Sequence, residues 1–132
     1  MHNYKSAVEL LRRASEMFHE RIAFKDASKS VTFHELYTLS QRLAKGLMDN
    51  TPTCSHLPVM VYLPKSVESI ISFMGSMYAG SPYVPMDYNV PMERFKVTGS
   101  NLCPTAVITD LKGKDKLSEA GVDIPILVYD DI

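Results

Sequence analysis

Apolar residues recur at helical spacing in residues 6–18, and charged residues fill positions between them. This pattern predicts an amphipathic helix. Two short strand-like stretches, 21–26 and 30–33, follow, and the polar residues between them predict a β-hairpin. Thr32 then precedes a second apolar stripe, and Glu35 three residues later completes the signature of a capping box. The first part of the chain is therefore expected to form a helix, a hairpin and a second helix.

The pattern changes after residue 57, where short apolar runs begin to alternate with helical segments. Nearly continuous apolar runs are typical of strands that are covered on both faces. The predicted strands are residues 58–63, 83–86, 105–109 and 126–130.

Cap and stop residues mark the helices between these strands. Ser66 is suited to cap the first helix, and Gly80 is suited to end it in a left-handed conformation. Asn89 and Pro91 predict the start of the next helix, with Asn89 as its cap. One side of the first helix carries only small residues, so a strand or another helix can approach it closely. These small residues are Ser72, Gly75, Ser76 and Ala79.

A weaker pattern near residues 114–120 predicts a third helix that ends at Gly121. Strands and helices thus alternate from residue 58 onward, which is typical of a parallel sheet with helices on its faces. The expected fold is α/β, a parallel sheet with helices on both faces, preceded by a helix and a short β-hairpin. Residues 1–57 hold the helix, hairpin and helix, and residues 58–132 hold the βα-repeating part.

The composition is that of an ordinary globular protein. The chain has 132 residues, a net charge of -1, 45% hydrophobic and 22% charged residues, so no general field favours nucleic acid or an acidic membrane. The Lys-rich residues 112–116 are interrupted by Asp115 and are expected to form a solvated loop.

Cysteine usage and the N-terminus indicate the compartment. Cys54 and Cys103 are far apart and form no CxxC pair, which favours a reducing cytosol over a disulfide framework. The N-terminus becomes charged too early for a secretory signal, and no apolar run is long enough to span a bilayer. A cytoplasmic location is expected.

The search for catalytic motifs is mostly negative. The sequence contains no GxGxxG, HExxH or GxSxG pattern. Gly75 and Gly80 have the spacing of a phosphate loop, but they fall at a helix end and lack the Lys and Ser/Thr that such a loop requires. Cys54 and His56 are read as a polar surface turn in preference to a metal site.

Acidic residues follow two of the predicted strands, where α/β proteins place their sites. Asp110, Asp130 and Asp131 have this position, and we favour ordinary helix caps or turns over catalysis for them. Arg94 is similarly expected to form a structural pair, with phosphate binding as the less favoured alternative.

Four stretches carry a resemblance to a known family. The stretch "VTFHEL" at 31–36 resembles the LTYxEL motif near the start of amino-acid adenylation domains. The stretch "MYAGSPYVPMD" at 77–87 resembles the motif LKAGxAYVPLD, "VPMER" at 90–94 matches the following PxxR, and "PTAVITD" at 104–110 is similar to the next strand. The chain thus resembles, from about residue 15 to its end, the superfamily of AMP-forming acyl and aminoacyl-adenylate ligases.

The resemblance implies that the chain is the N-terminal portion of the large adenylation domain of such a ligase. Members use ATP and Mg2+ to convert an amino acid or another carboxylate into an acyl-adenylate, which they pass to a phosphopantetheine thiol on a carrier protein. The sequence resembles peptide synthetase modules and D-alanine–carrier protein ligases more than acyl-CoA synthetases. Tyr78 and Pro82 depart from the motif, where Lys and Ala are usual.

The family's phosphate loop, nucleotide contacts, specificity pocket and mobile-domain lysine lie beyond the matched region. We therefore assign no catalytic, cofactor-binding or metal-binding residue, and expect the 132-residue chain alone to be inactive and to bind no cofactor. Two alternatives remain open, an acyl-CoA or aryl-CoA synthetase subclass and a free-standing α/β interaction domain without catalysis. The coding sequence downstream of Ile132 separates these readings. No partnership with nucleic acid or membrane is expected.

Overall fold

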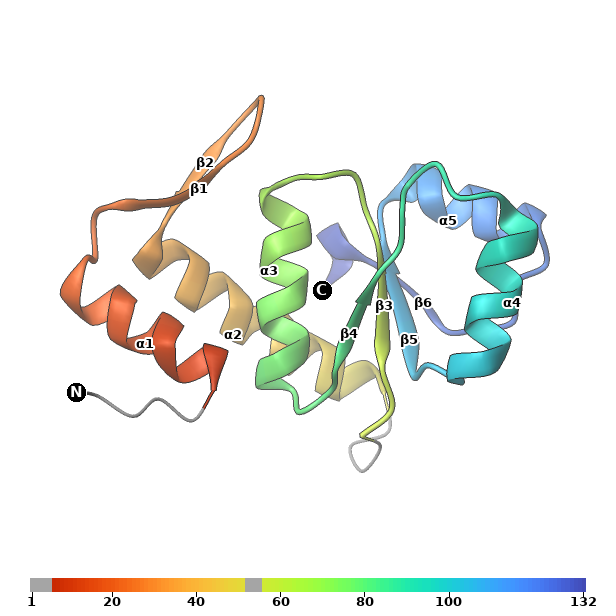
Figure 1. Cartoon of the computed structure of the whole chain (residues 1–132), viewed down its shortest axis with the longest axis horizontal. Helices are drawn as coiled ribbons and strands as arrows, with labels where there is room; N and C mark the ends of the chain where they lie inside the picture. The colour runs from red at the N-terminus through yellow and green to blue at the C-terminus, as the bar shows by residue number, and fades with distance from the viewer. Residues whose placement is uncertain (1–5, 52–55) are drawn as a thin grey trace.

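The computed structural model describes residues 6–51 and 56–132. A four-stranded sheet lies between two helical layers, and a separate two-stranded hairpin projects beside them (Figure 1). The α/β fold class predicted from the sequence is confirmed. The elements are α1 (Ala7–Met17), β1 (Ile22–Lys25), β2 (Ser30–Thr32), α2 (Phe33–Asn50), β3 (Val59–Tyr62), α3 (Val67–Tyr78), β4 (Tyr83–Pro85), α4 (Met92–Leu102), β5 (Ala106–Thr109), α5 (Leu111–Glu119), β6 (Ile126–Val128) and the short 3-10 helix η1 (Tyr129–Asp131).

The strands of the larger sheet are all parallel and lie in the order β4-β3-β5-β6. The two central strands, β3 and β5, are fully buried along their length. Their side chains alternate between two apolar clusters, because successive residues of a strand point to opposite faces. Val59 and Val61 pack toward α2 and α3, whereas Met60 and Tyr62 pack toward α4 and α5. This two-sided burial explains the continuous apolar runs in the sequence.

The caps at Thr32 and Ser66 and the helix stops at Gly80 and Gly121 that the sequence predicts are confirmed. Thr32 and Glu35 form the reciprocal bonds of a capping box at the start of α2. Ser66 accepts a hydrogen bond from the amide of Ser69 at the start of α3. Gly80 and Gly121 both have positive φ angles, 82° and 72°, a conformation that other residues adopt only with strain.

The small face of α3 packs directly against α2. A methyl group added at Gly75 would overlap the Leu43 side chain and come within 3.0 Å of the Ser40 carbonyl oxygen. Ser72 and Ser76 on the same helix are fully buried. The expectation of a close approach is therefore confirmed, and the neighbour is a helix.

Three boundaries predicted from the sequence are wrong. Helix α4 begins after Pro91, which occupies the cap position without a side-chain bond, and the Asn89 amide instead donates to Asp87 in a turn. Helix α5 begins at Leu111 because Asp110 caps it, so residues 112–116 are helical and not a loop. Strand β6 ends at Val128, since the chain turns into η1.

Helix α2 ends at Asn50, and Thr51 follows it as the C-cap. Among the described residues, none of the helices has the length and apolarity required to cross a membrane.

Candidate functional site

The carboxyl edge of the sheet is where α/β proteins bind their ligands, most often at the point where the strand order reverses. The chain places β4 on one side of β3 and β5 on the other, so that point lies between the ends of β3 and β5. Tyr62 ends β3, and Asp110 follows β5 directly. Tyr88, from the loop after β4, lies across both strand ends.

These residues bond to one another. The Tyr88 hydroxyl donates to the two carboxylate oxygens of Asp110, at 2.7 and 3.0 Å. The Tyr62 hydroxyl donates to the Tyr88 carbonyl oxygen at 3.1 Å, and the two rings lie 5.0 Å apart. The Lys116 ammonium lies 4.9 Å from the centre of the Tyr88 ring. Protein side chains thus fill the crevice between the strand ends.

The electrostatics of this cluster keep both phenols neutral. Burial raises the pKa of Tyr88, and the hydrogen bond to Asp110 raises it further. Burial, followed by the charges of Asp110 and Asp87, raises the pKa of Tyr62. Tyr88 donates to Asp110, which already caps α5, so its phenol has a structural role. Because this phenol stays protonated, it is poorly suited to act as a base.

A groove of about 1080 Å3 lies beside this cluster. Its walls come from the hairpin, the start of α3 and the loops that follow β3 and β4. Apolar side chains line most of it, including those of Phe24, Ile70, Phe73 and Met86. A large apolar groove with few polar groups is the usual form of a binding site, so this groove is the candidate site of the chain.

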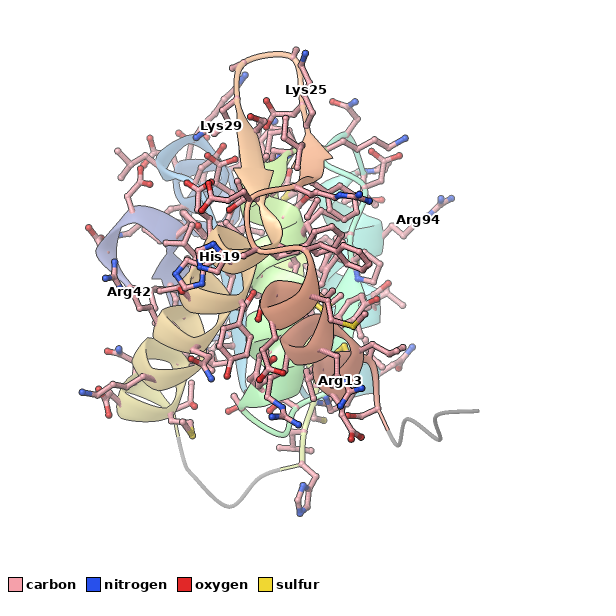
Figure 2. All side chains as sticks on the ribbon, turned by 90° about the vertical axis from the view of Figure 1, so that its left-hand side faces the viewer. Arg13, His19, Lys25, Lys29, Arg42 and Arg94 are labelled. Atoms are coloured by element: carbon pink, nitrogen blue, oxygen red, sulfur yellow. The ribbon has the colours of Figure 1, made fainter. Side chains whose placement is uncertain are left out.

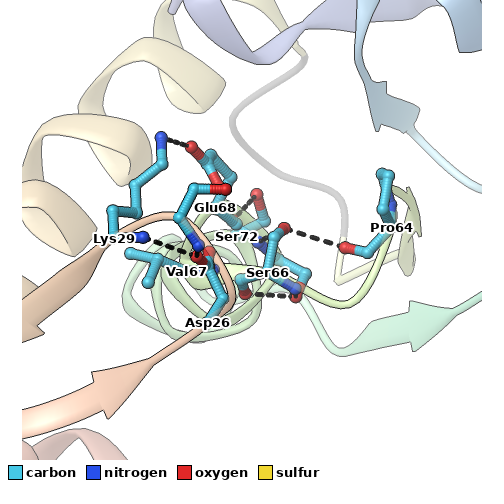
Figure 3. Close-up of polar contacts among 9 residues, drawn as sticks. Asp26, Lys29, Pro64, Ser66, Val67, Glu68 and Ser72 are labelled. Atoms are coloured by element: carbon cyan, nitrogen blue, oxygen red, sulfur yellow. Dashed lines mark hydrogen bonds and ion pairs between the residues drawn. The ribbon is translucent and has the colours of Figure 1, made fainter.

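The hairpin tip is bonded to the start of α3 along one side of the groove (Figure 3). Asp26 accepts hydrogen bonds from the amides of Ser28 and Lys29 through one oxygen, and from the amide of Val67 through the other. These amide donors, Val67 foremost, lower the pKa of Asp26. Lys29 also forms an ion pair with Glu68, which raises the pKa of Lys29.

The acidic residues predicted as caps or turns have those roles. Asp110 caps α5 by accepting a hydrogen bond from the Gly113 amide at 2.7 Å. Asp130 and Asp131 lie exposed in η1. No contact among the described residues joins either of them to Asp110, so the three carboxylates do not form one site.

Arg94 points outward from α4 and is exposed (Figure 2). Within the described part of the chain it forms no ion pair, so the structural pair expected from the sequence is not found there. The glycine pair Gly75 and Gly80 lies at the end of α3, as predicted, where no phosphate loop is formed.

Cys54, one half of the alternative metal pair, lies outside the described residues. Among residues 6–51 and 56–132, no group of three or more His, Cys, Asp or Glu side chains is arranged to hold a metal ion. His19 and His34 stack with ring centres 4.0 Å apart, and Glu20 lies 2.8 Å from His19 Nδ1, but these described side chains are not arranged to hold a metal ion. The structure therefore brings no metal-binding set together in this part of the chain.

Sequence reasoning missed Asp26 and Tyr88. The run from Asp26 to Lys29 has the local signature of a turn in which Asp accepts from amides two and three residues later. Its bond to Val67 spans 41 residues and has no local signature. The partnership of Tyr88 with Asp110 likewise depends on strand order, which the spacing of motifs did not specify.

ATP and Mg2+, which the resemblance implies, do not fit the residues described here. The helices that follow β3, β4 and β5 all start at the carboxyl edge. Two of these starts already have protein acceptors, because Asp26 accepts from Val67 in α3 and Asp110 accepts from Gly113 in α5. The start of α4 has no side-chain cap, but no glycine lies between β4 and α4, so none of the three starts offers free amides beside a glycine-rich loop of the kind that cradles phosphates. No reaction step through the nucleotide is therefore derived from this chain.

Comparison with solved structures identifies the fold. The VinN structure in complex with 3-methylaspartate matches with a TM-score of 0.85 at 23% identity, covering 94% of this chain and 34% of VinN. The N-terminal subdomain of NpsA from Klebsiella oxytoca matches with a TM-score of 0.80 at 21% identity, covering 97% of this chain and 31% of that chain.

Comparison with curated proteins gives closer relatives. A D-alanine–D-alanyl carrier protein ligase of Bacillus velezensis is 43% identical over 72 residues, which are 54% of this chain and 14% of the ligase. Syringomycin synthase SyrB1 of Pseudomonas syringae pv. syringae is 34% identical over 116 residues, which are 86% of this chain and 18% of the synthase. The chain thus spans less than a fifth of each of these relatives. The family model described as AMP-binding enzyme matches residues 11–131. The chain belongs to the AMP-binding enzyme family.

Proposed function

We propose that this chain is the N-terminal portion of the large domain of an ATP-dependent, AMP-forming ligase. The ligase activates an amino acid or another carboxylate as an acyl-adenylate. It then transfers the acyl group to the phosphopantetheine thiol of a carrier protein. Residues 1–57 and 58–132 are two consecutive parts of that one domain.

The similarity to the carrier protein ligase of Bacillus velezensis carries this proposal, at 43% identity over 72 residues. The similarity to syringomycin synthase SyrB1 supports the same subclass over 86% of the chain. Solved structures support the fold alone, since the matches are at 23% and 21% identity.

The contribution of this chain is structural. The motif at 77–87 forms the end of α3, the Gly80 turn, strand β4 and the start of the loop that carries Tyr88. The motif at 31–36 forms the capping box of α2. We assign no catalytic, cofactor-binding or metal-binding role to any of these residues, because the bonds described above already engage Asp26, Tyr88 and Asp110.

Carrier loading tests the proposed subclass. The product of the complete reading frame would be incubated with ATP, Mg2+, a panel of radiolabelled amino acids and either a phosphopantetheinylated carrier protein or free CoA. The proposal predicts label on the carrier in a bond that hydroxylamine cleaves, and no label on the carrier without its phosphopantetheine arm. Transfer to CoA alone would support the acyl-CoA synthetase subclass, and transfer to neither acceptor would contradict the carrier-loading function.

A further inference from the structure

The hairpin of β1 and β2 is joined to the rest of the molecule in two places with different strength. At its base, Val31 is buried in the core on the α2 side of the sheet, and Ala23 packs against that core. At its tip, the bonds of Asp26 and Lys29 to the start of α3 are the polar contacts (Figure 3). The tip and the base are therefore held by different chemistry.

The strands between base and tip add little support of their own. Strand β1 has mostly exposed side chains, among them Ile22 at 59% and Phe24 at 45% exposed. An isolated two-stranded ribbon is marginally stable in water. The pairing is also irregular, because the register shifts between Ile22 and Phe24. Such a bulge bends the ribbon locally, and it lies at the anchored base, because the buried Val31 pairs with Phe24 on the tip side of the bulge.

The hairpin covers part of the apolar groove. Phe24 and Lys25 of β1, and Asp26 and Ala27 of the turn, line the same groove as Phe73 and Met86. We propose that the tip of the hairpin, residues 25–30, is a hinged cover of this groove that moves about the buried Val31, with the Asp26 carboxylate on the Val67 amide as its latch. This inference does not depend on the proposed function.

The donor of the latch has no alternative bond within its helix. The Val67 amide belongs to the first turn of α3, where amides have no partner within the helix, and Asp26 accepts from it at 2.9 Å. The Ser69 amide two residues later is instead bound within α3 by the Ser66 hydroxyl. Opening the cover would therefore release the Val67 amide and leave the cap of α3 intact.

The neighbouring charges strengthen the closed position to a smaller degree. Lys29 pairs with Glu68, but more than half of the Lys29 side chain is exposed, so solvent screens that ion pair. Asp130 of η1 lies close enough to act on Lys29 electrostatically. Lys25 and Lys65 line the groove without an ion pair in the described part of the chain. Figure 2 shows Lys25 and Lys29 at the far end of the hairpin.

Two substitutions remove the latch from opposite sides. Asp26→Asn keeps one oxygen for the turn amides of Ser28 and Lys29, but an NH2 group replaces the oxygen that accepts from Val67. Val67→Pro removes the amide donor at the first helical position, where proline is tolerated. Asp115→Asn is the matched control, because Asp115 is an exposed carboxylate on α5 without a hydrogen bond or ion pair in the described part of the chain.

The cover would be followed by NMR in the presence of the soluble nitroxide TEMPOL, which speeds relaxation of accessible methyl groups. We expect relaxation of the Met86 methyl to rise about threefold in Asp26→Asn, as local opening without global unfolding requires. The methyl of Met60, which is fully buried, and the exchange rate of the Ser69 amide should stay unchanged. Asp115→Asn should behave like the unmodified chain.

A double variant with both Asp26→Asn and Val67→Pro tests whether the two substitutions break one shared bond or act on the groove independently. If Asp26 and Val67 act through one bond, the double variant should show no more exposure of Met86 than either single variant. Unchanged Met86 relaxation in Asp26→Asn would overturn the proposal, whatever the folding of Val67→Pro. Additive effects of the two substitutions would also overturn it, as would a matching rise at Met60, which would indicate general unfolding.

Discussion

At the scale of single residues, Ser40 has a property that the neighbouring serines lack. Its hydroxyl is fully buried between α2 and α3 and finds no hydrogen-bond partner in the described part of the chain. Ser72 and Ser76 on the facing helix each donate to a carbonyl oxygen one turn earlier. A buried hydroxyl without a partner costs free energy because its bonds to water are lost.

We therefore expect Ser40→Ala to raise the free energy of unfolding. Ser76→Ala is the matched control, since both positions are buried and helical and both gain the same helix propensity. The difference between the two variants in urea unfolding should be about 1 kcal/mol in favour of Ser40→Ala. Equal effects of the two substitutions would show that the Ser40 hydroxyl has a partner.

Tyr78 gives the chain a pH dependence in the alkaline range. Its hydroxyl donates to the Val8 carbonyl oxygen at 2.9 Å and so joins α3 to α1. Burial, followed by the nearby Tyr37, raises the pKa of Tyr78 from 10.0 to about 12. The folded state therefore keeps the phenol neutral where the unfolded chain ionises it. The stability that this provides is complete below pH 10 and is lost as the pH rises to about 12.

The comparison with Tyr78→Phe isolates this effect from other titrating groups. Urea unfolding of both proteins would be measured at several pH values from 9 upward. We expect the stability advantage of the unmodified chain to shrink as the pH rises from 10 toward 12. An advantage that stays constant across this range would contradict the assigned pKa.

Residue roles were predictable from sequence where the partner is local. The capping box of Thr32 and Glu35 and the turn at Gly80 depend on neighbours within a few positions, and both were correctly predicted. The bond between Asp26 and Val67 depends on where the hairpin folds, which has no local signature. The unpaired hydroxyl of Ser40 was likewise not predictable, because Ser40 has an ordinary position in the sequence of an amphipathic helix.

At the scale of elements, the contact between α2 and α3 depends on a glycine. A methyl group at Gly75 would overlap Leu43 and press on the Ser40 carbonyl oxygen. At Gly99 of α4 the same methyl would meet chiefly the tip of the Ile124 side chain, which can move. Gly75 and Gly99 thus differ in the neighbour that must yield.

Gly75→Ala is expected to destabilise the chain by about 1–3 kcal/mol, because backbone and core atoms must shift. Gly99→Ala is expected to be neutral or to gain up to about 1 kcal/mol from helix propensity. Thermal or urea unfolding of both variants checks this. Equal gains would mean that α2 and α3 can separate freely, contrary to the close packing described.

Element types were more predictable than element boundaries. The start of α5 was missed because the charged residues 112–116 were interpreted as a loop, although Asp110 had been considered as a helix cap. Strand β6 was extended too far because Tyr129 continues the apolar pattern, although its side chain packs from η1. Hydrophobic pattern alone does not distinguish a strand end from a turn that stays buried.

At the scale of the whole molecule, the parallel sheet and its two helical layers followed from periodicity, and the family followed from the motifs. The groove beside the hairpin did not, because it is formed by Phe24, Phe73 and Met86 from three separate elements. The order of the strands in the sheet decides which elements and loops lie side by side. The candidate site was therefore accessible only from the fold.

Amino-acid-dependent exchange between ATP and pyrophosphate is the most direct test of the proposed adenylating activity. It would be carried out with the 132-residue chain and with the product of the complete reading frame, using D-alanine and a panel of other carboxylates. We expect no exchange by the chain alone and substrate-dependent exchange by the complete product. Exchange by the chain alone, or no exchange by the complete product with any carboxylate, would contradict the proposed function.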